Sequence, residues 1–186
     1  MPTLTFRGQG RPPGYIKTHN GLAITVSDIR PEMLRPHDIA WHLARTCRYN
    51  GLMGSWYSNA EHSVLGMKLC DTWDGRRQYL VHDAGEMITG DVPYPVKALC
   101  PDYKKICDEV QQQVNFIFFG KREFLPEVKE ADYLITATEQ RDLRNQPDED
   151  LMVEPIKNFK FHCWSWEVAM VKWMEQFTIY YPEYHA

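Results

Sequence analysis

Hydrophobic residues recur every three or four positions along most of the chain beyond its N-terminal segment, which is the spacing of amphipathic helices. In the stretch HDIAWHLARTCRYN, Ile39, Leu43 and Cys47 lie at this spacing, and the Gly51 that follows suits the end of a helix. The pattern predicts helices over residues 37–50, 58–73, 76–88, 101–119, 126–144 and 163–180. Together these helices are expected to form the core of a mainly α (all-α) protein over residues 35–180.

Cap and turn signals mark the ends of these helices. Ser58 and Glu61 form a capping box at the start of the second helix, and Pro101 and Pro126 suit the first turn of two later ones. Gly120 suits the residue that follows a helix. Two prolines in the segment DVPYPVK predict an extended or turned backbone there, and QPDEDLMVEP is predicted to be a polar loop.

The N-terminal part of the chain follows a different pattern. Residues 1–14 are rich in Gly, Pro and Arg and are expected to be irregular. Two short β-prone runs then flank Asn20 and Gly21, a pair that favours a type I′ turn, so a β-hairpin is predicted over residues 15–26. This hairpin is too small to be a domain and could serve as a flap or as a contact between subunits.

The composition is that of a single globular domain over residues 1–186, with 44% hydrophobic and 25% charged residues. The net charge of −4 shows no basic excess, so a nucleic-acid polymer is not the expected partner, although a few local cations suffice for one nucleotide. No apolar run approaches the roughly 20 residues of a membrane helix, and the N-terminus lacks an apolar signal core. No membrane partner and a cytoplasmic location are therefore expected. Five cysteines without a C-x-x-C pair argue against a disulfide framework and a thiolate zinc site.

Titratable residues gather in the stretch YLVHDAGEMITGD, directly after a Tyr-Leu-Val run. His82 and Asp83 are adjacent, so their side chains leave a helix about 100° apart; they cannot face one another, but both can reach a metal ion beside the helix. Glu86 lies over the same face, one turn farther on. Gly85, inside this turn, is explained either by close approach of another helix or a ligand, or by tolerated variation.

Two further polar residues lie on apolar helix faces. The leucines that follow His62 share its face, which directs this histidine inward, and Asp132 lies on the apolar stripe of its own helix. A buried, unpaired carboxylate costs several kcal/mol, so Asp132 needs a partner, either a cation or backbone donors. With His82 and Asp83 these residues would supply two nitrogen and two oxygen ligands, a mixed set that suits Mn, Fe, Co, Ni or Zn.

The order H…HD…D in this sequence, with AEHS around His62, HDAGE around His82 and Asp132 in EADYL, resembles the HD-domain metal-dependent phosphohydrolases. HDAGEMITGDVPYPVK is similar to the bacterial 5′-deoxynucleotidase branch, in which HD is followed by a Glu, a Gly-Asp pair and P-x-P-V-K. CRYNG followed by WYSNAEHS is similar to small phage members, which include dATP triphosphohydrolases. The sequence departs from the pattern at Gly85, where a Ser is expected, and at Tyr49, where the nucleotidases carry a Trp.

The resemblance implies an HD-domain helical bundle in which one divalent transition metal (Zn, Co, Mn, Fe or Ni) is held by His62, His82, Asp83 and Asp132. Such a metal would act as a Lewis acid and lower the pKa of a bound water toward about 7. Glu86 would then orient or deprotonate this water, Asp91 could instead hold the water or help the leaving 5′-oxygen, and the motif does not choose which acid is the base. A second divalent ion such as Mg²⁺ could accompany a triphosphate substrate.

The resemblance also implies a small-molecule nucleotide substrate. Arg48 and Lys97 would bind its phosphate, and Tyr49 would stack on the base, pack against the sugar, or be a simple core aromatic. The phage-like segment favours a triphosphohydrolase that converts a dATP-like substrate to deoxynucleoside and triphosphate. The alternative is a 5′-deoxynucleotidase that releases phosphate from monophosphates; more distant ones are a non-catalytic nucleotide sensor and a structural helical protein. By analogy with the family, a homo-oligomer is expected, located in the host cytoplasm if the protein is encoded by a phage.

Overall fold

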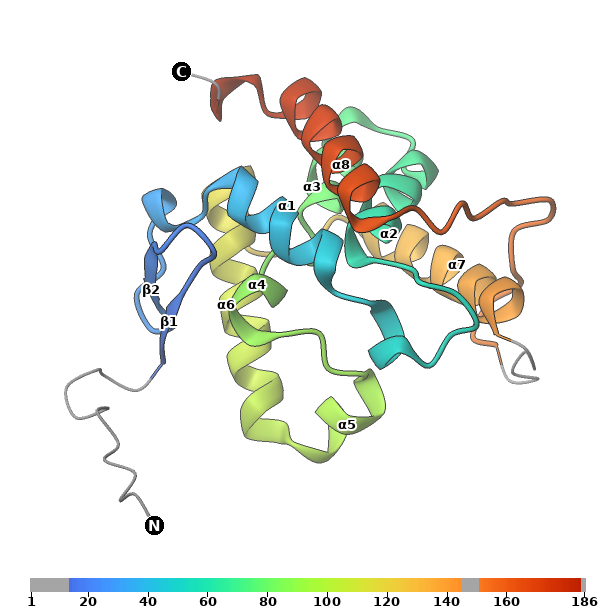
Figure 1. The fold of residues 1–186 in the computed structure, drawn as a ribbon, viewed down its shortest axis with the longest axis horizontal. Helices are drawn as coiled ribbons and strands as arrows, with labels where there is room; N and C mark the ends of the chain where they lie inside the picture. The colour runs from blue at the N-terminus through green and yellow to red at the C-terminus, as the bar shows by residue number, and fades with distance from the viewer. Residues whose placement is uncertain (1–13, 145–150, 185–186) are drawn as a thin grey trace, which may run out of the picture.

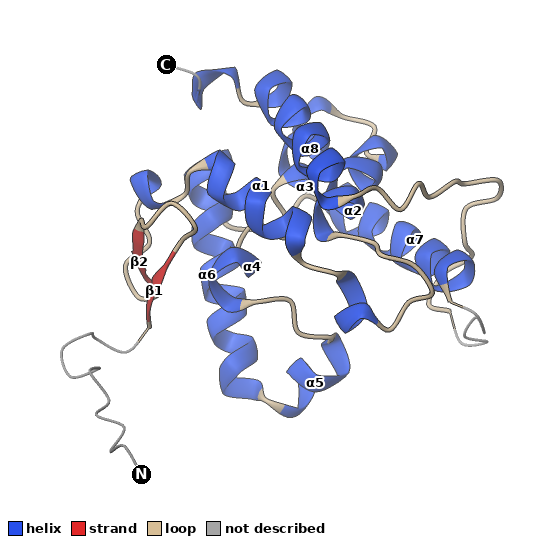
Figure 2. Cartoon of the chain, in the orientation of Figure 1, coloured by secondary structure: helices blue, strands red, loops and turns tan. Residues whose placement is uncertain are grey.

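A computed structural model gives the fold and describes residues 14–144 and 151–184. This part of the chain contains eight α-helices and one two-stranded antiparallel hairpin, which confirms the predicted mainly α class (Figures 1 and 2). Nearly all of the N-terminal segment predicted to be irregular and the first half of the loop QPDEDLMVEP lie outside the described residues. Among the helices in the described ranges, none combines the length and apolar character that a bilayer crossing requires.

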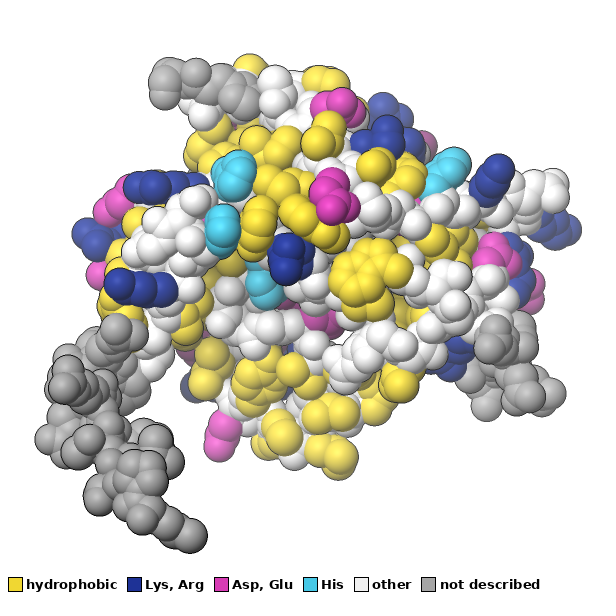
Figure 3. All heavy atoms as spheres, viewed as in Figure 1, with side chains coloured by type: hydrophobic (Ala, Val, Ile, Leu, Met, Phe, Trp, Pro, Cys, Tyr) yellow, Lys and Arg dark blue, Asp and Glu magenta, His cyan; other side chains and the backbone are white. Residues whose placement is uncertain are grey.

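The helices are α1 (Pro36–Arg45), α2 (Asn59–Gly66), α3 (Trp73–Leu80), α4 (Glu86–Thr89), α5 (Tyr94–Leu99), α6 (Pro101–Phe119), α7 (Pro126–Leu143) and α8 (Trp166–Tyr180). Helix α8 packs against α1, α2 and α3, while α7 packs against α2 and α3 (Figure 1). Helices α4 and α5 lie beside α6. Figure 3 shows hydrophobic side chains gathered over α5, where the exposed residues include Tyr94, Val96 and Leu99.

Helix α8 ties the core to the end of α3. Its buried residues Ala169, Trp173 and Phe177 are spaced by four, so they form one stripe that faces the other helices. The indole Nε1 of Trp173 donates a hydrogen bond of 3.1 Å to the backbone oxygen of Leu80, the last residue of α3. Because a buried carbonyl at a helix end needs a donor, this bond holds the chain in place just before the HD dipeptide.

The predicted hairpin is present, with strands β1 (Tyr15–Lys17) and β2 (Ala23–Thr25). The predicted type I′ turn is wrong. That turn needs positive φ at two successive residues, but here Gly21 has a φ of 78° and the preceding asparagine is not among the residues with positive φ. The Gly21 N–H donates to the Thr18 oxygen, and the Thr18 N–H pairs with Leu22, so three residues form the loop and the last is a left-handed glycine.

Three predicted helices end earlier than their hydrophobic pattern indicates. The helix predicted over 37–50 stops at Arg45, because Cys47 pairs with Ser58 in a β-bridge. Arg48–Gly51 then forms a separate short 3₁₀ turn, η2, in which Tyr49 and Asn50 adopt left-handed φ angles of 56° and 55°.

The helices predicted over 58–73 and 76–88 are each interrupted. Helix α2 ends at Gly66. Helix α3 begins at Trp73, three residues before the predicted start, but it ends at Leu80, and tight turns lead from there into α4. In the DVPYPVK segment, predicted to be extended or turned, residues 91–93 are non-helical as predicted, but the short helix α5 follows them, since prolines are tolerated in a helix's first turn. Helix α8 begins at Trp166, three residues later than predicted, because Ser165 caps it.

The other boundary signals are confirmed, since Pro101 and Pro126 open α6 and α7, and Gly120 ends α6 with a φ of 74°. In the capping box, Ser58 Oγ accepts a hydrogen bond of 3.1 Å from the Glu61 N–H. The buried Glu61 carboxylate is used elsewhere: it accepts hydrogen bonds from the backbone N–H groups of residues 162–164 at 2.6–3.0 Å. It thereby holds the segment before α8 against α2.

Gly66→Ala is expected to destabilise the protein by about 1–3 kcal/mol. Gly66 has helical dihedral angles, so alanine would ordinarily favour the helix, but a Cβ at this position would overlap the hydroxyl and ring of Tyr79. Urea unfolding of the variant measures the loss, with Glu130→Ala on the exposed face of α7 as the control. A Gly66→Ala protein as stable as the wild type would contradict this close contact.

Candidate functional site

Two histidines and two aspartates from three segments of the chain converge beside α2. His62 comes from α2, His82 and Asp83 from the turns between α3 and α4, and Asp132 from α7. The Nε2 atom of His62 lies 3.2 Å from His82 Nε2 and 3.2 Å from Asp132 Oδ1. His82 Nε2 lies 3.3 Å from Asp83 Oδ2 and 3.8 Å from Asp132 Oδ1. The structure therefore brings together all four predicted metal ligands.

These separations suit a shared cation. Metal–nitrogen and metal–oxygen bonds of about 2.0–2.2 Å place neighbouring ligand atoms roughly 3–3.5 Å apart. Single ligand atoms of His62, His82 and Asp83 lie within 4.8 Å of one another, and the two histidines are buried. These three residues could hold a metal ion, with Asp132 as a fourth ligand at the same point. Their nitrogen and oxygen donors do not identify the metal.

In both histidines an oxygen atom lies within hydrogen-bond distance of Nδ1, the ring nitrogen that faces away from the cluster. His62 Nδ1 lies 2.6 Å from Oε1 of Glu139, and His82 Nδ1 lies 2.6 Å from the backbone oxygen of Tyr79. Because a carbonyl or an ionised carboxylate can only accept, each histidine donates from Nδ1 and turns the lone pair of Nε2 toward the cluster. Once a metal ion displaces any hydrogen from Nε2, this is the tautomer that a metal ligand requires.

The electrostatics of the cluster favour a positive charge. Burial and the Arg48 cation lower the pKa of His62, but the carboxylates of Glu139 and Asp132 outweigh them and raise it to about 9. Burial raises the pKa of Asp132, yet the hydrogen bond with His62 and the charge of His82 hold it well below its usual range. Carboxylates around a pair of buried imidazoles therefore stabilise a cation there.

The prediction that His82 and Asp83 cannot face one another is wrong. It assumed a regular helix, in which adjacent side chains diverge, but residues 81–85 form successive tight turns. The choice left open for Gly85 is resolved by helix α6: a Cβ would lie 3.3 Å from Gln111 Cα, and Gln111 Oε1 accepts the Gly85 N–H at 2.8 Å. Glycine thus allows α6 to approach the turn that carries two of the ligands.

Glu86, the first residue of α4, lies beside this cluster. The Asn59 side-chain amide donates to Glu86 Oε2, and Lys97 Nζ lies 3.6 Å from Oε1. Burial and the nearby carboxylates of Asp83 and Asp91 raise the pKa of Glu86 well above its usual value. Asp91 follows the left-handed Gly90, and both acids line one cavity, so the structure places the two predicted water-handling carboxylates on the same wall.

Arg48 and Tyr49 line the same cavity from η2. Arg48 Nε lies 3.3 Å from Glu139 Oε2, and its Nη1 lies 3.3 Å from Asp83 Oδ2. The Tyr49 hydroxyl donates to Glu139 Oε2 at 2.7 Å. Two of the Arg48 nitrogens are thus engaged with protein carboxylates, and the predicted binding of phosphate by Arg48 stays a prediction.

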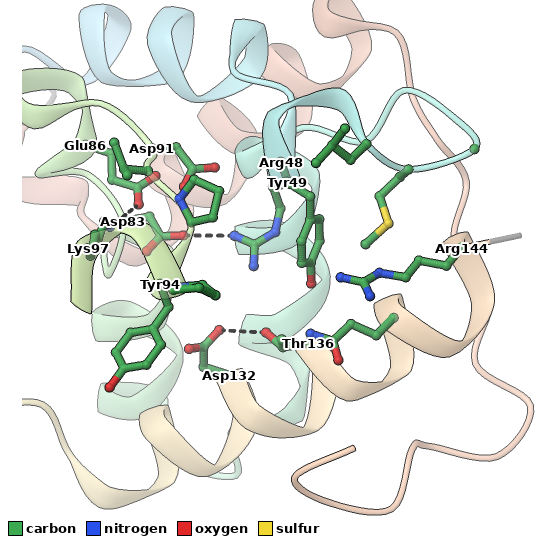
Figure 4. Close-up of a pocket in the computed structure, with 17 residues that line it drawn as sticks. Arg48, Tyr49, Asp83, Glu86, Asp91, Tyr94, Lys97, Asp132, Thr136 and Arg144 are labelled. Carbon is green, nitrogen blue, oxygen red and sulfur yellow. Dashed lines mark hydrogen bonds and ion pairs between the residues drawn. The ribbon is translucent and has the colours of Figure 1, made fainter. Parts of the chain in front are cut away.

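A cavity of about 990 Å³ opens over the cluster. The predicted site residues that line it are Arg48, Tyr49, Asp83, Glu86, Asp91, Lys97 and Asp132. Figure 4 shows Glu86, Asp91 and Lys97 on one side, Tyr49 and Arg144 on the other, and Asp132 and Thr136 between them on α7. This volume is at the upper end of the range for small-molecule sites.

Sequence reasoning missed Glu139 and Asn59, which contact the predicted residues. Glu139 lies seven positions after Asp132, which is two helical turns on the same face of α7, and Asn59 lies three positions before His62 on α2. These spacings were the available signal. They were not sufficient, because the partners of Glu139 lie 77 to 91 residues away in the chain.

Comparison with models of known protein families finds no match for this chain. Among curated proteins, the uncharacterized protein YfdR of Escherichia coli (strain K12) is 33% identical over 129 residues. The aligned region covers 69% of this chain and 72% of YfdR, so the likeness extends over most of both proteins. On this similarity, the chain belongs to the protein family of YfdR.

Proposed function

We propose that this protein is an HD-type phosphohydrolase that hydrolyses the 5′-phosphate ester of a deoxynucleotide. The observation that carries the proposal is the convergence of His62, His82, Asp83 and Asp132 at the floor of a cavity of about 990 Å³. The proposal also agrees with the H…HD…D order of the sequence and with the Lys97 cation on the cavity wall. YfdR, being uncharacterized, adds no activity to this argument.

A divalent ion held by the four ligands would supply Lewis acidity toward a phosphoryl oxygen and a water of lowered pKa. We assign Glu86 as the general base that takes the proton from the attacking water. Its two carboxylate oxygens are oriented by Asn59 and Lys97, and it stands three residues from the ligand Asp83. The water oxygen forms a bond to phosphorus as the bond to the 5′-oxygen breaks, and the proton taken by Glu86 is then passed to the leaving 5′-oxygen, which Asp91 stands on the same wall to assist.

The shape of the cavity favours a triphosphate substrate over a monophosphate. Four residues of α7 at a spacing of four, Asp132, Thr136, Gln140 and Arg144, line it. At 1.5 Å per residue this row extends roughly 18 Å from the metal cluster, so there is room for groups beyond the reacting phosphate. The 5′-deoxynucleotidase that acts on monophosphates is the second candidate, and the Lys97 cation beside Glu86, placed to bind one phosphate group next to the proposed base, is the observation that favours it.

Product analysis tests the proposal. The wild-type protein is incubated with each deoxynucleoside mono- and triphosphate in the presence of Mn²⁺, Co²⁺, Zn²⁺, Ni²⁺ or Mg²⁺. Deoxynucleoside and triphosphate are the expected products, whereas release of phosphate from dAMP alone would assign the monophosphatase. Nucleotide binding without hydrolysis under every condition would contradict catalysis and identify a sensor.

A further inference from the structure

We propose that Glu139 is a positioning residue that sets the tautomer of His62 and, with the same carboxylate, holds Arg48 and Tyr49 in place at the cavity. The metal half of this inference needs only the His–Asp cluster. The half that concerns ligand binding rests on the proposed function. Glu139 would thus join the metal cluster to the wall that receives the substrate.

The contacts of Glu139 divide between its two oxygens. The residue is fully buried on α7. Oε1 accepts the Nδ1 hydrogen of His62 at 2.6 Å, while Oε2 accepts from Tyr49 Oη at 2.7 Å and from Arg48 Nε at 3.3 Å. His62, Tyr49 and Arg48 each place a donor against this carboxylate, so it acts as an acceptor on both sides. One carboxylate oxygen therefore orients the metal ligand His62, and the other holds Arg48 and Tyr49 at the cavity wall.

Arg48 extends this connection to a second ligand. Its Nη1 lies 3.3 Å from Asp83 Oδ2 while its Nε bonds Glu139, so the guanidinium bridges the two carboxylates. His62, Glu139, Arg48 and Asp83 consequently form a chain that begins and ends at the metal cluster. An ion pair of this kind, with both partners largely buried, keeps both ligands in one geometry.

The backbone of η2 is strained and therefore needs contacts that hold it in place. Tyr49 and Asn50 hold left-handed φ angles, which non-glycine residues adopt at a cost in free energy. The hydroxyl of Tyr49 reaches back to Glu139, and its ring lies 5.4 Å from the Arg48 guanidinium carbon. These contacts hold the strained turn and keep the Tyr49 side chain on the cavity wall.

Glutamine at position 139 would have the same shape but could not satisfy both sides. If its oxygen faced His62, its NH₂ group would meet the hydrogen donors of Arg48 and Tyr49. If its NH₂ group faced His62, the imidazole would have to accept at Nδ1 and carry its hydrogen on Nε2, where the metal binds. Either orientation replaces an acceptor with a donor, so Glu139→Gln separates hydrogen-bond direction from packing.

The experiment titrates the metal-free protein with Co²⁺ and follows the visible absorption of the bound ion. Glu139→Gln is expected to weaken Co²⁺ binding by about 10–100-fold. In the protein loaded with Zn²⁺, which is diamagnetic, nitrogen-15 NMR of histidine should show a hydrogen on His62 Nδ1 in the wild type and its loss in Glu139→Gln. A merely structural role would leave the NMR signature unchanged.

Two variants serve as controls. Glu61→Gln alters another buried carboxylate, on the residue next to His62 in the chain. The Glu61 carboxylate accepts hydrogen bonds from the backbone N–H groups of residues 162–164. This variant should lower the stability of the protein but keep its Co²⁺ affinity within about twofold. Tyr49→Phe preserves the contact between Glu139 and His62. It should also keep Co²⁺ affinity within about twofold, while raising KM for the nucleotide severalfold with a smaller effect on kcat.

Wild-type Co²⁺ affinity and an unchanged His62 tautomer in Glu139→Gln would overturn the proposal, as would equal losses of affinity in Glu139→Gln and Glu61→Gln. If Glu139→Gln does not fold, Glu139→Asp carries the test: its shortened carboxylate should give intermediate Co²⁺ affinity, and wild-type affinity would contradict the role. The metal and NMR readouts require no turnover. A protein that binds Co²⁺ as expected but hydrolyses no nucleotide therefore refutes the proposed function and leaves the role of Glu139 toward His62 standing.

Discussion

His82→Ala is expected to abolish metal binding and to lower nucleotide hydrolysis by about 1,000-fold or more. The His82 Nε2 atom lies within 3.2–3.8 Å of the ligand atoms of His62, Asp83 and Asp132, so its removal opens the cluster at its centre. The bond from His82 Nδ1 to the Tyr79 oxygen also disappears, and the orientation of this turn is weakened. Elemental analysis of the purified protein and Co²⁺ titration measure the metal, and product release measures activity.

The matched control for this prediction is His162→Ala. The His162 side chain is exposed and stacks on Trp164 at 5.6 Å, outside the cavity, and its backbone N–H, which bonds Glu61, is kept in alanine. Metal content and activity should therefore match the wild type. If His82→Ala binds as much metal as the wild type, the cluster is not the metal site and the proposed function loses its main support.

Glu86→Gln is expected to lower kcat by about 10²–10⁴-fold while the protein keeps its metal. Glutamine retains the shape of Glu86 and the bond with Asn59, but it cannot accept a proton from water at neutral pH. Asp91→Asn, on the same wall, should lower kcat by only about tenfold, as expected for assistance to the leaving oxygen. Single-turnover measurements of both variants, alongside metal analysis, separate the chemical step from binding.

The comparison of these two variants decides between the acids. A larger loss of kcat in Asp91→Asn would move the role of general base to Asp91, and equal small losses would show that neither acid takes the proton. Loss of metal in Glu86→Gln would instead make Glu86 part of the metal site. Thr136→Ala, a neutral residue of the cavity wall that bonds Asp132 at 3.5 Å, is the control for general disturbance of the pocket.

Much of the helical fold is predictable because its signals are local. The apolar spacing along the chain and the caps at Pro101, Gly120 and Pro126 depend on residues within a few positions of one another. The interruptions of these helices have tertiary causes. Cys47 leaves the helical path to pair with Ser58, and Gly66 accommodates the ring of Tyr79 from another helix. A periodic pattern carries no information about such neighbours.

The candidate site, like the fold, is predictable from the sequence only in part. The order and types of its residues (His62, the pair His82 and Asp83, Glu86 and Asp132) are present in the sequence, which by itself determined the class of chemistry to expect. Only the tertiary structure decided that four ligand atoms meet and that Glu139 orients His62 while it holds Arg48. The physical reason is that hydrogen-bond direction and burial depend on atoms up to 91 residues apart in the chain, which become neighbours only when α2, η2 and α7 pack together.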